Sequence, residues 1–308
     1  MTNLQPVVAS PSPATRRVIA AASLTRRERN ITLAGVLVAL LLAGLDQTIV
    51  ATAGPAIQRD LQIAPALYAW LTTAYLVMAT VMLPIYGKLS DRFGRKPILI
   101  IGVSIFLTGS LLCGISQGAI SLIAARGVQG IGAAALFTTA FAVIADLYPP
   151  AVRGRYMGLI SGVMGLASVI GPLAGGFITD AFGWHWVFFI NLPIGSVALW
   201  FIITTMPRLG VHSEQRLPVD ILGAVLLFIG VVPLMIALSV GRAEGSAAGG
   251  GYSWTSWQVL TMLGLAGAGL ISFLIRERHA PDPILHLELF RNRVVSFGAA
   301  ALFVIGAA

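Results

Sequence analysis

Residues 87–96, with the sequence Gly-Lys-Leu-Ser-Asp-Arg-Phe-Gly-Arg-Lys, hold five charged side chains between two long apolar runs. The runs cover residues 67–86 and 97–116, and each is long enough to cross a hydrocarbon core of about 30 Å as a helix. Two such helices joined by so short a polar connection reverse direction at one face of a bilayer. The pattern therefore indicates an all-α, polytopic membrane protein.

The composition of the whole chain supports the same class. Of 308 residues, 57% are hydrophobic and only 10% are charged, whereas about a quarter are charged in a typical soluble domain. The net charge of +8 would suggest nucleic-acid binding in a soluble protein. Here the basic residues lie in short connections between apolar runs, where they set membrane topology, so no nucleic-acid partner is expected.

Charged or glycine- and proline-rich breaks divide the chain into eight predicted spans and the start of a ninth. The spans are residues 31–54, 67–86, 97–116, 119–145, 156–177, 184–205, 221–240 and 257–275. The ninth begins near Val294, and the chain ends at Ala308 before such a helix would have crossed the bilayer. An end within a span predicts a truncated product or a fragment.

The distribution of Lys and Arg predicts the orientation. With the N-terminus inside, seventeen of these residues fall in inner segments, and only Arg59 and Arg242 fall in outer loops. This bias predicts a cytoplasmic N-terminus in the plasma or inner membrane. The basic residues at 26–29 precede an apolar run too long for a signal peptide, so the first span is expected to remain uncleaved behind a disordered tail.

Asp46 and Arg126 are charged residues that fall well inside predicted spans. A carboxylate at this depth costs about 2.5–3.5 kcal/mol on insertion scales, so Asp46 is expected to face a cavity or a partner. Satisfying a neighbouring backbone group is the alternative role. A guanidinium does not release its proton in a protein, so Arg126 needs an anion or several carbonyl groups. At about 1.5 Å per residue, both lie roughly 10–12 Å below the outer surface, which is compatible with an ion pair.

Asp91 is the one acid among the four cations of residues 87–96. A loop that only sets topology would need the cations, but neither this acid nor the glycines. Asp91 is therefore expected to cap a helix or to pair with an arginine, forming a latch that a conformational change can break.

The predicted fifth span is rich in glycine. Pairs four residues apart, Gly158 with Gly162 and Gly171 with Gly175, let another helix approach closely. Pro172 removes a backbone donor and bends the helix. A helix that seals or hinges is one interpretation, and ordinary tight packing is the other.

Taken together, these stretches resemble the major facilitator superfamily, and in particular its fourteen-span drug:proton antiporters. The signature between spans two and three is matched at Gly87, Asp91, Arg92, Gly94 and Arg95, and residues 122–134 are similar to the span-four signature around Arg126. The antiporter signature of span five is matched at Gly162, Gly171, Pro172, Gly175 and Gly176.

Three further stretches are similar to the fourteen-span group. They are residues 45–50 (Leu-Asp-Gln-Thr-Ile-Val), 184–193 and 283–293. Two departures are visible, because Gly54 stands where leucine is usual and His185 stands where arginine is common. Neither departure removes a charged residue from a span.

The resemblance implies a domain organisation. Residues 1–30 would form the basic cytoplasmic tail, 31–206 a six-helix bundle, 207–280 a two-helix insert, and 281–308 the start of a second bundle that is otherwise missing.

The resemblance also implies a function, which is export of hydrophobic or cationic drugs in exchange for protons. Asp46 would carry the proton or attract the cation, and Arg126 would tune it. Residues 87–96 would gate the cytoplasmic side. The alternative is a non-transporting fragment or a partner subunit.

An enzyme finds little support in the sequence. The spans hold no His/Glu cluster with metal-ligand spacing, and neither a Gly-x-Ser-x-Gly elbow nor a phosphate-binding loop is present. Catalysis, ATP hydrolysis, a cofactor and a metal site are therefore not expected, and the predicted partners are lipid, protons and small substrates.

Overall fold

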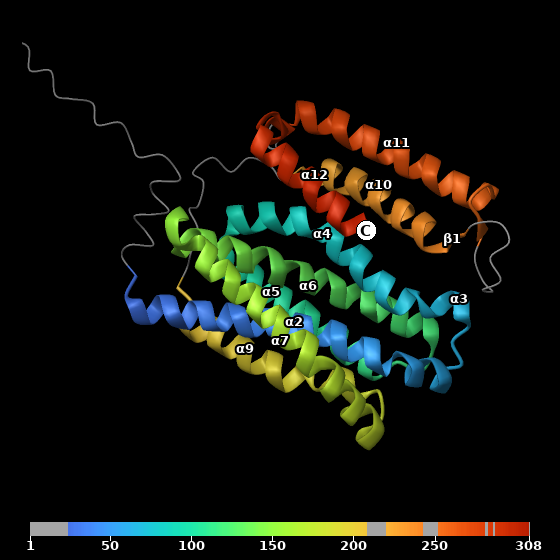
Figure 1. The fold of residues 1–308 in the computed structure, drawn as a ribbon, viewed down its shortest axis with the longest axis horizontal. Coiled ribbons are helices and arrows are strands. Elements are labelled where there is room, and N and C mark those ends of the chain that lie inside the picture. The colour runs from blue at the N-terminus through green and yellow to red at the C-terminus, as the bar shows by residue number, and fades with distance from the viewer. Residues whose placement is uncertain (1–23, 208–219, 243–251, 281–282, 286, 308) are drawn as a thin grey trace, which may run out of the picture. The chain divides into compact units, whose positions relative to one another are not determined.

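The computed structural model describes residues 24–207, 220–242, 252–280, 283–285 and 287–307. Nearly all of them are helical, which confirms the all-α membrane fold (Figure 1). Within this part of the chain, eight helical segments are long and apolar enough to cross a membrane. The chain divides into two compact units, residues 1–214 and 215–308, which are described separately below.

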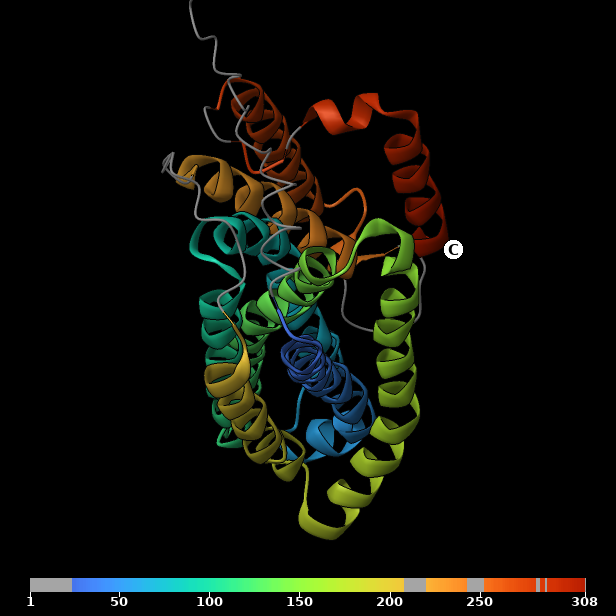
Figure 2. The same ribbon diagram turned by 90° about the vertical axis from the view of Figure 1, so that its left-hand side faces the viewer.

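Unit 1 contains the first six predicted spans. Its helices are α2 (Arg26–Asp60), α3 (Pro65–Tyr68), α4 (Trp70–Phe93), α5 (Arg95–Gly114), α6 (Ala119–Leu147), α7 (Pro150–Phe182), α8 (Trp186–Phe189) and α9 (Asn191–Thr205). The helix α2 lies among α6, α7 and α9 (Figure 2).

Several helices run beyond the predicted spans. Helix α2 has 35 residues and begins with a capping box, in which Thr25 and Glu28 bond each other's backbone N–H groups. Helix α7 has 33 residues. Hydropathy reports only the apolar part of a helix, whereas capped backbone hydrogen bonding continues into the polar turns.

The sixth predicted span is a helical stretch, Trp186–Thr205, in which one residue, Ile190, separates α8 from α9. The short α8 ends at Phe189, Ile190 intervenes, and α9 starts at Asn191. Pro193 has no backbone N–H, so the carbonyl of Phe189 cannot receive the usual helical bond from four residues later. The loss of this one hydrogen bond between α8 and α9 thus has a local cause in the sequence.

Glycines on α6 bring its two neighbours close. A Cβ on Gly130 would lie 2.3 Å from the backbone oxygen of Tyr75 in α4, and one on Gly132 would lie 2.3 Å from the backbone nitrogen of Phe106 in α5. No larger residue fits at either position without moving a helix backbone. Helix α6 is therefore packed tightly between α4 and α5.

Helix α7 contacts α2 in the same way. A Cβ on Gly171 would lie 1.8 Å from Oγ1 of Thr48, and one on Gly175 would lie 2.9 Å from the carbonyl oxygen of Ile49. By contrast, a Cβ on Gly162 or Gly176 would meet no atom within 4 Å. The close approach predicted for Gly171 and Gly175 is thus present in unit 1, and the one predicted for Gly162 stays a prediction.

Unit 2 contains α10 (Ile221–Val240), α11 (Trp257–His279), the 3-10 helix η1 (Leu287–Arg291) and α12 (Arg293–Ala307). Strands β1 (Gly241–Arg242) and β2 (Tyr252–Ser253) form a two-residue parallel pair. Helices α10 and α11 pack closely, since a Cβ on Gly269 would lie 2.7 Å from the backbone nitrogen of Gly230. The separation of a two-helix insert from the start of a second bundle stays a prediction.

The predicted orientation can be tested with two exposed positions in unit 1. Gln117 lies in the turn between α5 and α6, and Ala151 lies in the first turn of α7. In a Cys113→Ala background, the positive-inside bias predicts that a membrane-impermeant thiol reagent labels Gln117→Cys in intact cells. Ala151→Cys should be labelled only after permeabilisation. Labelling of both in intact cells would contradict the orientation.

The α2–α7 contact predicts opposite effects at adjacent glycines. Gly175→Ala should lower the free energy of unfolding by about 1–3 kcal/mol, because the backbone of α2 must move. Gly176→Ala meets open space and should be neutral or raise it by up to about 1 kcal/mol through helix propensity. Unfolding of the purified chain in dodecyl sulfate measures both, and equal losses would refute the tight contact.

Candidate functional site

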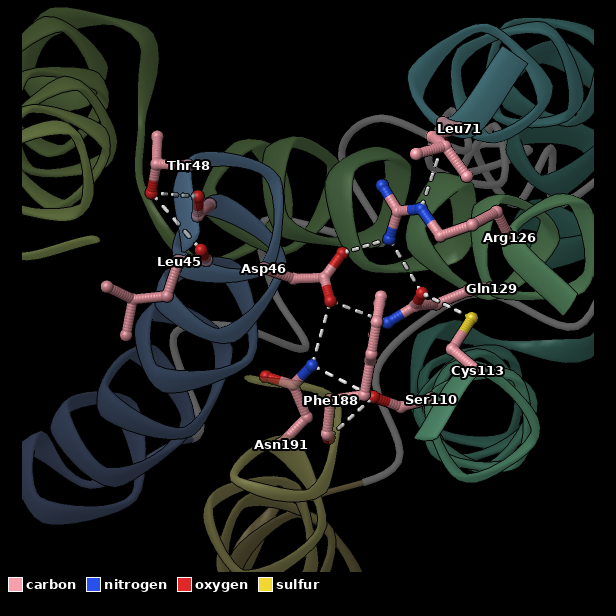
Figure 3. A network of polar contacts seen from close by, with 11 residues as sticks. Leu45, Asp46, Thr48, Leu71, Ser110, Cys113, Arg126, Gln129, Phe188 and Asn191 are labelled. Carbon is pink, nitrogen blue, oxygen red and sulfur yellow. Dashed lines mark hydrogen bonds and ion pairs between the residues drawn. The ribbon is translucent and has the colours of Figure 1, made fainter. Parts of the chain in front are cut away.

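Asp46 and Arg126 form an ion pair in the interior of unit 1. Oδ2 of Asp46, on α2, lies 2.7 Å from Nη1 of Arg126, on α6 (Figure 3). Their side chains are 0% and 1% exposed, respectively. Taking two charges out of water costs several kcal/mol per ion, so the surrounding groups decide whether the pair is tolerated.

The Asp46 carboxylate is surrounded by donors. Oδ1 accepts hydrogen bonds from Nε2 of Gln129 at 2.7 Å and from Nδ2 of Asn191 at 2.8 Å. Together with the bond from Arg126, three N–H groups point at the carboxylate.

Arg126 is satisfied from several helices as well. Its Nε donates to the backbone oxygen of Leu71 on α4 at 3.1 Å, and its Nη1 also donates to Oε1 of Gln129 at 2.7 Å. The guanidinium carbon lies 4.4 Å from the ring centroid of Tyr75, a cation–π distance. The charge on Arg126 is thus balanced by an anion, two oxygens and an aromatic face.

A second layer connects this site to α5 and α8. Nδ2 of Asn191 also donates to Oγ of Ser110 at 2.9 Å, and Ser110 in turn donates to the backbone oxygen of Phe188 at 2.9 Å. The thiol of Cys113 lies 3.6 Å from Oε1 of Gln129. Polar groups from α4, α5, α6 and α9 therefore surround the buried carboxylate on α2.

No role was predicted for Gln129, Asn191 or Ser110 from the sequence. The two amides carried a usable signal, because an amide inside a span is costly unless it is hydrogen-bonded. Ser110 carried none, since a serine can bond its own helix backbone.

Arg95 is the centre of the polar contacts in residues 87–96. Its guanidinium lies 2.7 Å from Asp91 and 2.8 Å from Asp146, and it donates to Ser90 at 2.7 Å. The Asp91 side chain is half exposed, whereas the side chains of Arg95 and Asp146 are buried. The predicted arginine partner of Asp91 is therefore Arg95, while Asp146, at the end of α6, was missed because it is distant in sequence.

The remaining residues of this segment shape the turn. Gly94 has a φ of 92°, a backbone conformation that favours glycine. The backbone oxygen of Gly87 accepts from Ser90, and Arg92 stacks 5.4 Å from the ring centroid of Phe93. Nζ of Lys96 donates to two carbonyl groups at the end of α9, those of Ile203 and Met206.

Helix α7 contacts α2 close to the ion pair. Gly171 packs on Thr48, two residues from Asp46, and Oγ1 of Thr48 donates to the backbone oxygen of Ala167 at 3.0 Å. Pro172 lies inside the continuous helix α7. Among the described residues, no group of three or more His, Cys, Asp or Glu is placed to hold a metal ion.

Long apolar helices that hold an ion pair in their interior define a class of protein, the polytopic helical membrane proteins. The family model described as Major Facilitator Superfamily matches residues 36–308. The chain belongs to this superfamily.

Its relatives include multidrug transporters. The chain is 42% identical over 272 residues to Multidrug resistance protein 3 of Bacillus subtilis, covering 88% of this chain and 51% of that protein. It is 41% identical over 270 residues to Multidrug transporter protein MdtP of the same organism, covering 88% and 48%. The chain spans about half the length of the curated relatives it matches.

A solved structure supports the fold. The human organic anion transporter MFSD10 (TETRAN) matches with a TM-score of 0.54 and 19% identity, covering 76% of this chain and 59% of that one. At this identity the likeness shows the fold alone.

The contacts of Arg95 predict unequal roles for its two acids. Asp146→Asn weakens a buried, charge-assisted contact and should lower the unfolding free energy by about 1.5–3 kcal/mol. Asp91→Asn changes a half-exposed pair and should cost less than about 1 kcal/mol. Dodecyl sulfate unfolding of the two variants tests this, and a larger loss for Asp91→Asn would contradict the burial argument.

Proposed function

We propose that this protein is a proton-coupled antiporter of the fourteen-span drug exporter group, which moves hydrophobic or cationic compounds out of the cell. Membership of the superfamily and similarity to multidrug transporters support a drug transporter. The observation that carries the proton coupling is the Asp46 carboxylate, which is fully buried and held by a cation and two amides.

Asp46 is suited to bind either a proton or a cation. Among the acids of unit 1 that the structure describes, it is the one that is fully buried. A proton on Asp46 removes its negative charge and leaves Arg126 without its anion, which weakens the contact between α2 and α6. A cationic substrate near Asp46 favours loss of that proton. Proton and substrate are then alternative partners of one carboxylate, which is the requirement for exchange.

Arg126 keeps the site from holding a proton permanently. Its fixed positive charge, 2.7 Å away, favours the ionised carboxylate, while burial favours the neutral one. Because these two effects oppose each other, small movements of the helices can change whether the ionised or the protonated form of Asp46 is preferred. In this proposal the protein lies in the plasma membrane with its N-terminus in the cytoplasm.

The cytoplasmic segment, residues 87–96, would control access to the site. Arg95 joins α5 to α4 through Asp91 and to α6 through Asp146. A change in the spacing of these helices requires at least one of these contacts to open. The half-exposed Asp91 is the contact that opens at the lower cost.

The proposal predicts proton release on substrate binding. Addition of tetraphenylphosphonium, a lipophilic cation, to the purified chain in weakly buffered detergent should release up to one proton per chain, measured with a pH indicator. Asp46→Asn preserves the side-chain volume but cannot exchange a proton, so the release should be abolished. Energised cells that express the protein should correspondingly lose gradient-driven export of the cation with this variant.

Asp180→Asn is the matched control, because Asp180 is an exposed acid near the end of α7. Its proton release and export should equal those of the parent chain. Undiminished proton release and export by Asp46→Asn would reject the carboxylate as the coupling group. Loss of cation export with normal export of a neutral compound would instead assign Asp46 to cation recognition.

A further inference from the structure

Asn191 lies between the Asp46 site and the junction of α8 with α9. It is the first residue of α9, directly after Ile190 at the α8–α9 junction, and it is 1% exposed. Its Nδ2 donates both to Asp46 and to Ser110, while its oxygen points away from the carboxylate (Figure 3). The amide therefore joins the proposed proton site to the α8–α9 junction.

The present arrangement suits only the ionised carboxylate. Every side chain that bonds Asp46 donates a proton to it, so a protonated Asp46 would lack an acceptor for its own O–H. A side-chain amide can supply that acceptor by turning through about 180°, which exchanges its NH₂ group and its oxygen. Two amides, Gln129 and Asn191, are within reach.

Gln129 is held in its orientation. Its oxygen accepts from Nη1 of Arg126 at 2.7 Å and lies 3.6 Å from the thiol of Cys113. Turning this amide would place its NH₂ group against the guanidinium of Arg126, two donors facing each other. The orientation of Gln129 is therefore fixed by the arginine.

The orientation of the Asn191 amide is not fixed by a charged side chain. If its amide turns, its oxygen can accept the proton of Asp46 and also a hydrogen bond from the hydroxyl of Ser110. That hydroxyl has one proton, which it now donates to the backbone oxygen of Phe188. Turning Asn191 thus draws Ser110 away from Phe188, in the last turn before the junction.

We propose that Asn191 and Ser110 are positioning residues that transmit the protonation of Asp46 to the α8–α9 junction. With Asp46 ionised, the Asn191 NH₂ group faces it and Ser110 holds Phe188. With Asp46 protonated, the Asn191 oxygen faces it, Ser110 turns to Asn191, and the junction is released. The inference rests on the proposed function, because it requires Asp46 to take up a proton.

Other groups around Asp46 do not provide this connection. The charged and titratable side chains that face it from the packed helices of unit 1 are Arg126 of α6, Tyr75 of α4 and Cys113 of α5. Among the described residues, none of these three forms a hydrogen bond to α8 or α9. The polar route to the sixth span runs through Asn191.

The test follows two signals in the purified chain as pH is varied. Infrared spectroscopy reports the carbonyl band of protonated Asp46, assigned by its absence in Asp46→Asn. Hydrogen exchange reports the backbone amides of residues 189–192. In the parent chain, exchange at the junction should rise about tenfold over the same pH range in which the Asp46 band appears, as expected for loss of one hydrogen bond.

Three variants separate the steps. Asp46→Asn should leave junction exchange independent of pH. Ser110→Ala should keep the titration of the Asp46 band but flatten the pH dependence of junction exchange to less than about twofold. Asn191→Leu should flatten it as well, because leucine cannot exchange a donor for an acceptor.

The outcomes distinguish the two proposals. If the Asp46 band titrates in the parent chain but hydrogen exchange at the junction does not change with pH, the proposed transmission by Asn191 is overturned. The proposed function is not affected by that result. Absence of an Asp46-dependent band at every pH overturns both. Junction exchange in Ser110→Ala that follows pH as in the parent also overturns the proposed route, even where Asn191→Leu does not fold.

Discussion

The ion pair between Asp46 and Arg126 is the contact on which the arrangement of unit 1 depends. Two opposite charges in a dry interior attract strongly, but each has lost its hydration, and the pair is tolerated only when its remaining polar atoms are also bonded. Neither α2 nor α6 can supply those bonds alone. The backbone of α4, the amide at the start of α9 and the serine of α5 complete the shell, so the positions of these helices are set by one carboxylate and one guanidinium.

Small residues make that shell possible. Bonds of about 2.7–3.1 Å require helix backbones to approach closely, and the glycines of α6 allow this on both sides, at Gly130 toward α4 and at Gly132 toward α5. Gly171 does the same for α7 against α2, one turn from the charged pair. A larger side chain at Gly130 or Gly132 would separate donors from acceptors, so close packing and hydrogen bonding depend on the same glycines.

Much of this organisation can be predicted from the sequence, and the failures have physical causes. Apolar length predicts the spans, and the matched depth of Asp46 and Arg126 is compatible with their pairing. Periodicity does not predict how each helix is rotated, because these helices are apolar on nearly all sides, and so Asn191 and Asp146 were not assigned as partners. The loss of one backbone hydrogen bond beside Asn191 was not predicted, because hydropathy does not register that Pro193 lacks a backbone donor.

The choice of amides around the carboxylate follows from the same constraint. A site that alternates between a charged and a neutral acid must exchange a donor for an acceptor without opening a void, and an Asn or Gln amide can do this at constant volume. A lysine or arginine in their place would only donate. Gln129 is held by the guanidinium, whereas Asn191 stands where the helix has already lost a backbone bond. In the proposed mechanism, the amide of Asn191 exchanges its partners beside this missing bond when Asp46 takes up a proton.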